Sequence, residues 1–190
     1  MRSKGHPMRT PTIHRIAVAV GIIGLVLAGC STTDDASDTT AALPTPETVE
    51  VTATDFAYVG LPSEVAAGTA LTLTNDSAVE LHELVAFRIP DDDTRTVDEL
   101  IQLPPEELGA FFANVATVII APPNEAGFPV EGTGTLTEPG RYGIICAIPT
   151  GADPADYLEA AAAAEGGPPD VAGGPPHFVN GMFAELTVTG

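Results

Sequence analysis

Histidine, cysteine and methionine, whose side chains bind soft metal ions, are scarce in the chain after residue 30. This part of the chain holds two histidines, one cysteine and one methionine, namely His82, Cys146, His177 and Met182. Two imidazoles and one thiolate, with a weak axial thioether, form the donor set of a type 1, or blue, copper centre. The set therefore predicts a site for one copper ion, in which the thiolate supplies strong covalency and the thioether tunes the potential.

Taken singly, each of these residues has a simpler explanation. A lone cysteine such as Cys146 is more often a small buried hydrophobe, Met182 alone would be a core filler, and a single histidine is more often on the surface or hydrogen-bonded. The joint interpretation as copper ligands is favoured because no other histidine, thiol or methionine competes after residue 30.

The elements that must position these ligands are predicted to be strands. Apolar and polar residues alternate in short runs, and turn residues recur between the runs at the spacing of a sandwich. These runs lie at residues 49–58, 71–74, 84–89, 115–120, 133–136, 141–146 and 183–188. We therefore predict an all-β fold, an antiparallel Greek-key β-sandwich of seven or eight strands with two short helical insertions, at about residues 91–114 and 151–174.

Helix signals support both insertions. In the first, Thr96 and Glu99 have the spacing of a capping box. In the second, Asp153 is a good N-cap, Pro154 suits the first helical position and Gly166 is a terminator. A helix is predicted near residues 154–165.

The N-terminal residues are typical of a targeting segment. Basic residues precede an apolar run at residues 16–28, which has the length of a signal-peptide core. The run ends in Leu27, Ala28, Gly29 and Cys30, which resembles the lipobox of bacterial and archaeal lipoproteins. An uncleaved anchor and an ordinary secretory signal are the alternatives. We predict a signal peptide at residues 1–29, a lipid anchor on Cys30, a flexible tether at residues 30–48 and one domain at residues 49–190.

The charge of the chain excludes one class of partner. Three arginines and no lysine follow residue 29, against 26 acidic residues, so the formal charge of this part is −23. Nucleic-acid binding requires Lys and Arg to neutralise phosphates, and we therefore expect no nucleic-acid partner. Such a surface favours cationic partners or metal cations.

Residues 49–190 resemble the cupredoxin family of plastocyanin-like blue copper proteins, apart from the two insertions. Leu71 to Asn75 followed by His82 matches the family's strand, Asn and first His, and a Pro139-Gly140-Arg141-Tyr142 turn precedes Cys146 as it does there. His177 and Met182 are separated by four residues, as in plastocyanin. The resemblance implies that His82, Cys146, His177 and Met182 hold one type 1 copper ion.

The resemblance further implies an electron carrier rather than an enzyme. The chain would be a monomer that exchanges single electrons with redox partner proteins of the cell envelope, on the extracytoplasmic side of the membrane that holds its lipid anchor. The alternatives are a copper-handling lipoprotein that buffers or delivers the ion, and a metal-free binding module.

Two features differ from the familiar members of the family. Glu83 follows His82 where many relatives have Asn, so the hydrogen bonds around the thiolate are expected to differ. Thirty residues separate Cys146 from His177 where those members have only a few, so the shortness of the loop does not fix the ligand geometry.

Overall fold

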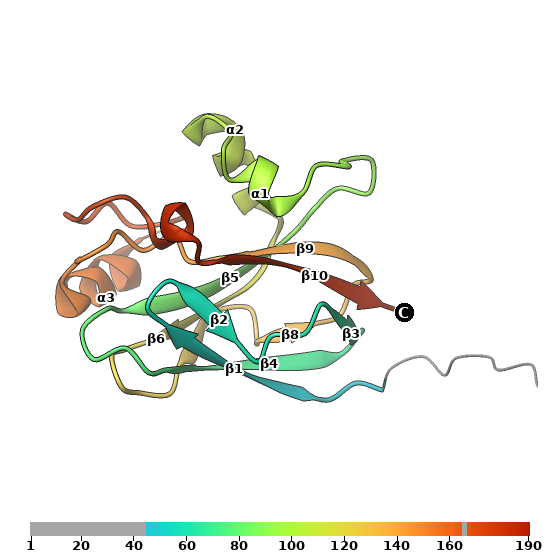
Figure 1. Ribbon diagram of the computed structural model, residues 1–190, viewed down its shortest axis with the longest axis horizontal. Helices are drawn as coiled ribbons and strands as arrows, with labels where there is room; N and C mark the ends of the chain where they lie inside the picture. The colour runs from blue at the N-terminus through green and yellow to red at the C-terminus, as the bar shows by residue number, and fades with distance from the viewer. Residues whose placement is uncertain (1–44, 165–166) are drawn as a thin grey trace, which may run out of the picture. The chain divides into compact units, whose positions relative to one another are not determined.

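The computed structural model describes residues 45–164 and 167–190 (Figure 1). These residues form ten strands, three α-helices and two 3-10 helices. The strands are β1 (Thr48–Thr54), β2 (Ala57–Val59), β3 (Glu64–Ala66), β4 (Thr69–Asn75), β5 (His82–Arg88), β6 (Val115–Ala121), β7 (Phe128–Glu131), β8 (Thr135–Leu136), β9 (Gly140–Ile145) and β10 (Phe183–Thr189). The helices are α1 (Val97–Leu100), α2 (Pro105–Gly109), η1 (Ala110–Asn114), α3 (Pro154–Ala163) and η2 (His177–Asn180).

The strands form two sheets that pack face to face. One sheet has the order β2-β1-β4-β8, and the other has the order β3-β10-β9-β5-β6-β7. Alternation along β1 turns Val51 toward the core, and Leu73 of the neighbouring strand lies in the same hydrophobic cluster. Leu84, Ile144 and Leu186 of the second sheet belong to this cluster too, and they are fully buried. The β-sandwich predicted from the sequence is confirmed.

The strand number and part of the pairing differ from the prediction. There are ten strands because the predicted run at residues 49–58 divides into β1 and β2, and because the short strands β3 and β7 lie outside the predicted runs. Two pairs, β1 with β4 and β10 with β3, are parallel rather than antiparallel. Side chains alternate with period two in both kinds of pair, so burial patterns cannot distinguish them.

The first insertion is helical, as predicted, and covers the outer face of the larger sheet. Thr96 and Glu99 form the predicted capping box at the start of α1. Leu100 and Phe111 pack with Phe87 of β5 and Ile145 of β9 in a second hydrophobic cluster, separate from the main one. Figure 1 shows α1 and α2 on this side of β9 and β10.

Arg141 of β9 fastens the first insertion to the sheet. Its guanidinium donates to both carboxylate oxygens of Glu185 on β10, at 2.9 Å each. It also donates to the backbone carbonyls of Asp93 and Arg95, at 2.9 and 2.7 Å. One cation therefore joins two strands to the loop that leads into α1.

The second insertion contains the predicted helix. The side chain of Asp153 accepts from the backbone N–H groups of Ala155 and Asp156, and Pro154 occupies the first helical position. The helix ends at Ala163, whereas the predicted terminator Gly166 lies outside the described residues. Tyr157 is the one fully buried large side chain of this helix.

The predicted signal peptide, Cys30 and the tether up to residue 44 lie outside the described residues. Within the described part of the chain, no helix combines the length and the apolar character that a membrane span requires.

Candidate metal centre

The predicted ligands come from neighbouring strand ends. His82 is the first residue of β5, and Cys146 directly follows β9. These strands are antiparallel neighbours, with Val85 opposite Ile145, so the start of one lies beside the end of the other. His177 begins η2, which precedes β10, the other neighbour of β9. Sheet pairing therefore brings together ligands that are far apart in sequence.

Three of the four predicted donors meet in one buried cluster. The Nδ1 atoms of His82 and His177 lie 3.1 Å apart, and the Sγ atom of Cys146 lies 3.3 Å from Nδ1 of His177. All three residues are fully buried. Among the described residues, this is the group of His, Cys and acidic side chains whose ligand atoms converge for a metal ion, within 4.8 Å of one another.

The chemistry of this cluster fits a cation. Two Nδ1 atoms that face each other cannot both donate a hydrogen bond, whereas both can offer lone pairs to one positive ion. The outer Nε2 atoms of His82 and His177 have no aligned hydrogen-bond partner among the described residues. Imidazole and thiolate donors in this combination suit copper.

The loop before His82 is held by Asn75, at the end of β4. Its Nδ2 atom donates to the backbone carbonyls of Glu80 and Ala121, each at 2.9 Å. Its Oδ1 atom accepts from the N–H of Ser77 at 2.8 Å. The side chain thereby ties the loop to β6, and this bonding fixes the approach to His82.

A short backbone ladder closes the long insertion between Cys146 and His177. We call residues 146–150 and 174–178 the neck of this insertion. The N–H of Phe178 donates to the carbonyl of Cys146 at 2.9 Å, and the N–H of His177 donates to the carbonyl of Ile148 at 3.0 Å. Thr150 donates to Pro175 at 3.0 Å and accepts from Gly174 at 2.8 Å. The neck, rather than a short loop, therefore holds the two ligands side by side.

Met182 is bonded to both sides of the neck through its backbone. Its N–H donates to the carbonyl of His177, and its carbonyl accepts from the N–H of Cys146, both at 3.2 Å. Gly181 before it has a φ of 106°, a left-handed conformation that a side chain would strain. The Met182 side chain is fully buried. Its role as the axial ligand stays a prediction.

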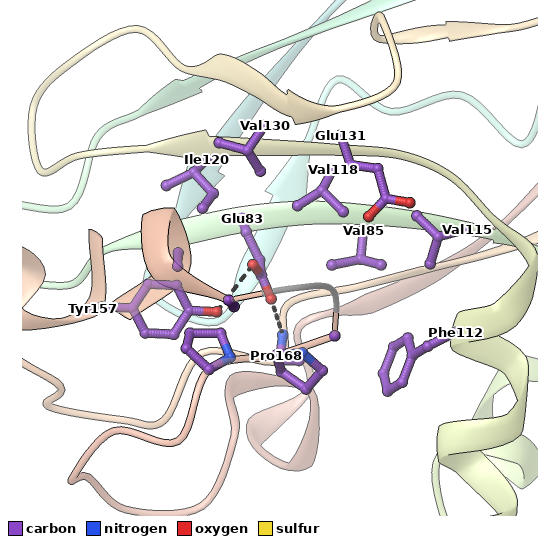
Figure 2. A pocket seen from close by; sticks show the side chains of 15 residues that line it. Glu83, Val85, Phe112, Val115, Val118, Ile120, Val130, Glu131, Tyr157 and Pro168 are labelled. Carbon is purple, nitrogen blue, oxygen red and sulfur yellow. Dashed lines mark hydrogen bonds between the residues drawn. The ribbon is translucent and has the colours of Figure 1, made fainter. Parts of the chain in front are cut away.

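Glu83 connects the thiol to the inserted helix. Its backbone N–H donates to Sγ of Cys146 at 3.4 Å. Its carboxylate accepts from the N–H of Ala147 at 3.0 Å and from the hydroxyl of Tyr157 at 3.3 Å (Figure 2). The side chain is buried, with the residue 4% exposed. Glu83, which differs from the Asn of many cupredoxins, thus joins the Cys146 thiol, the Ala147 backbone and the Tyr157 hydroxyl. The sequence did not predict these three partners.

Burial keeps both imidazoles neutral. Loss of hydration, with a smaller effect of the neighbouring His177, lowers the pKa of His82 to about 4. Burial also lowers the pKa of His177, against the opposing charge of Glu80. One Glu80 oxygen lies 3.3 Å from Nε2 of His177, but the contact lacks the alignment of a hydrogen bond. Neutral imidazole is the form that binds a metal ion.

The Cys146 thiol and the Glu83 carboxyl both have pKa values above their ordinary ones. Burial, and then the charge of Glu83, raises the pKa of the Cys146 thiol. Burial raises the pKa of Glu83 to about 7, against the hydrogen bonds from Ala147 and Tyr157. A thiolate at this position therefore needs a compensating cation, and metal binding is expected to release the thiol proton.

Phe56 also contributes to the centre, and sequence reasoning missed it. Its ring meets the His177 ring edge-on, with the centroids 5.0 Å apart. Phe56 has a φ of 63°, which is rare for an aromatic residue and is a strained conformation. The turn between β1 and β2 thus places an apolar ring against one of the predicted ligands.

Comparisons with known proteins give only structural similarities. No family model and no curated protein matches the chain. Among solved structures, reduced auracyanin from Roseiflexus castenholzii is 21% identical, over 77% of this chain and 99% of that one, with a TM-score of 0.42. Auracyanin A of Chloroflexus aurantiacus, a blue copper protein, is 21% identical over 76% and 100%, with a TM-score of 0.40. Auracyanin B is 22% identical over 78% and 94%, with a TM-score of 0.42. At these low values the functional proposal rests on the metal centre itself.

Proposed function

We propose that this chain is a cupredoxin that carries single electrons through one type 1 copper ion. The observation that carries the proposal is the buried convergence of His82 Nδ1, His177 Nδ1 and Cys146 Sγ. Bound copper supplies a one-electron couple. We assign Met182, which is buried and bonded by its backbone to both other ligand segments, as the weak axial ligand.

The protein's own contribution is rigidity and exclusion of water. The backbone ladder of the neck and the side chains of Asn75 and Glu83 hold the backbone of the ligand segments in place. Full burial of His82, Cys146 and His177 removes solvent that would reorganise when charge changes. A fixed, dry donor set favours electron transfer because neither ligands nor water must move far.

The surface around the centre favours a partner with basic groups. Val79 and Val179, close in sequence to the histidines, are exposed apolar residues at 73% and 59%. Arg88 lies at the far end of β5, about 20 Å from His82 at 3.3 Å per residue. Arg141 is at the corresponding end of β9 and bonds to the Arg95 backbone. The centre thus lies away from all three arginines, and an acidic surface steers basic partners.

The site of action follows from the N-terminal motif. We propose that Cys30 carries a lipid that holds the domain at the outer face of the cytoplasmic membrane, supported by the Leu27-Ala28-Gly29-Cys30 sequence. Changing Cys30→Ala should release or misprocess the protein and leave the copper centre intact. Lipid label that persists on this variant would contradict the anchor.

Titration with Cu(II) tests the redox proposal. The chain should develop an intense thiolate-to-copper absorption band in the visible spectrum with one equivalent, and Cys146→Ser should abolish this band while leaving the fold intact. Tight Cu(I) binding without the band would indicate a copper-handling protein instead. Absence of binding would indicate a metal-free binding module.

The axial assignment has its own test. Met182→Leu should keep the colour and raise the reduction potential, because loss of a weak thioether mainly favours Cu(I). An unchanged potential in this variant would show that Met182 is not the axial ligand.

A further inference from the structure

A cavity of about 270 Å³ lies on the outer face of the larger sheet, between the two insertions (Figure 2). Val85, Val118 and Ile120 of β5 and β6 form its floor. Phe112 of the first insertion and Ala161 of α3 form opposite walls. The space is therefore bounded by the sheet and by both insertions, and it is open to solvent on one side.

Small side chains at the C-terminal end of α3 leave this space open. Ala161 of α3 and Ala164, the first residue after the helix, border the cavity, where larger residues would reach toward the sheet. Val118 remains partly exposed although its strand is paired on both sides, and Val130 of β7 is 49% exposed. The mouth of the cavity is therefore apolar and accessible from solvent.

The polar groups of the cavity all favour one kind of ligand. They are the carboxylates of Glu83 and Glu131 and the hydroxyl of Tyr157. Glu83 is buried and points toward the cavity centre, where it accepts from Ala147 and Tyr157 and retains further acceptor capacity (Figure 2). Among the described residues that line the cavity there is no Lys, Arg or His. An anion would be repelled here, whereas a hydrogen-bond donor would find an acceptor.

The volume limits the ligand to about one ring. An apolar cavity of about 150 Å³ is sufficient to hold benzene. The space beside Glu83 therefore accommodates a substituted six-membered ring, with its apolar body against Val85, Val118 and Phe112.

From these observations, we propose that the cavity between the two insertions is a binding site for a small, uncharged aromatic molecule that donates a hydrogen bond to Glu83. Phenols represent this class. The site is separate from the metal cluster and occupies the opposite face of β5, because His82 and Glu83 are consecutive residues of one strand.

Phenol is the probe, and methyl NMR of the full chain in detergent provides the readout. The measurement uses reducing conditions, in which any bound copper is diamagnetic Cu(I). The methyl signals of Val85 and Val118 should shift saturably with phenol, whereas those of Val65 and Val188, outside the cavity lining, should not. Toluene, which lacks the donor, and benzoate, which is anionic, should bind at least about tenfold more weakly, because a buried acceptor would stay unpaired or face a like charge.

A matched pair of variants locates the binding. Ala161→Phe fills the cavity and should weaken phenol binding at least about tenfold. Ala162→Phe makes the same change one residue along α3, on an exposed position outside the lining, and should bind phenol as the parent chain does. Because both variants share the same micelles, the comparison cancels phenol partitioning into detergent.

Three outcomes would overturn the proposal. They are no saturable shift of the cavity methyl groups, equal binding of toluene and phenol, and equal effects of the two alanine variants. None of these readouts depends on copper, so such a failure leaves the electron-transfer proposal standing. Conversely, a failed copper titration would leave phenol binding to be judged by its own result.

Discussion

The two helical insertions occupy the same sandwich but stabilise it in different ways. The first contributes Leu100 and Phe111 to a separate hydrophobic cluster on Phe87 and Ile145. The second sends Tyr157 into the main cluster, where its hydroxyl bonds to Glu83, the residue next to His82.

This difference shows that an insertion's contacts, rather than its length or its helix, decide whether it matters to the metal centre. The first insertion is held by apolar burial and by the Arg141 hydrogen bonds, and none of these hydrogen bonds is to a predicted metal ligand, so its loss should change stability and little else. The second joins a hydrogen-bond junction that also holds the Cys146 thiol, so it should affect both stability and the metal centre.

Tyr157→Ala should give the largest effect. Removing this fully buried side chain should lower the free energy of unfolding by about 3–5 kcal/mol. It should also shift the visible band of the copper-loaded protein, because Glu83 loses a hydrogen-bond donor. Denaturant unfolding and absorption spectra measure the two effects, with half-buried Leu158→Ala as the milder control on the same helix. A loss below about 1 kcal/mol would show that α3 is a surface addition.

Leu100→Ala should destabilise the protein by about 3 kcal/mol, because a fully buried leucine leaves a cavity in the second cluster. The visible band and the reduction potential should stay unchanged. Half-buried Ile101→Ala should cost less in the same unfolding assay. A band shift with Leu100→Ala would mean that the first insertion is coupled to the copper centre.

Tyr157→Phe separates the hydroxyl from the ring. Loss of the donor leaves a buried Glu83 oxygen without its partner, which should cost about 1–3 kcal/mol and alter the band or the potential. Tyr142→Phe is the matched control, since its buried residue also loses one hydroxyl bond, to the carbonyl of Glu138 at 2.9 Å, near the start of β9. That variant should lose comparable stability with an unchanged spectrum. Equal spectra in both variants would refute a special role for Tyr157.

Thr96→Ala should have the smallest effect. It removes the capping box of α1 on an exposed surface and should lower the free energy of unfolding by about 1 kcal/mol. The spectrum should not change. A spectral change here would contradict the assignment of the first insertion to stability alone.

The sequence predicts most reliably what depends on local pattern or on scarce residue types. The capping box at Thr96 and the helix after Asp153 follow from spacing, and both are confirmed. The three converging donors were found because few residues of their kind exist in the chain after residue 30.

What the sequence could not predict involves long-range contacts. Tyr157 and Glu83 lie 74 residues apart in the sequence, and neither residue type indicates which partner its side chain will bond to. The Gly-Pro-rich segment before His177 has no periodicity, so the sequence does not predict its backbone hydrogen bonds in the neck. The sequence pattern predicts Phe56 within the strand at residues 49–58, whereas its positive φ places it in the turn beside His177.

Because of the neck, the entropic cost of closing the long insertion falls on protein folding and not on metal binding. Closing a flexible loop of about 30 residues costs about 3 kcal/mol by the logarithmic length rule. The hydrogen bonds between residues 146–150 and 174–178 come mainly from backbone groups, with one from the Thr150 hydroxyl to the Pro175 carbonyl, and none of them requires the ion, so folding closes this loop. An ion bound by Cys146 and His177 therefore meets ligands whose separation along the chain no longer weakens its affinity. Chain length at this point can vary in evolution without a thermodynamic penalty at the metal.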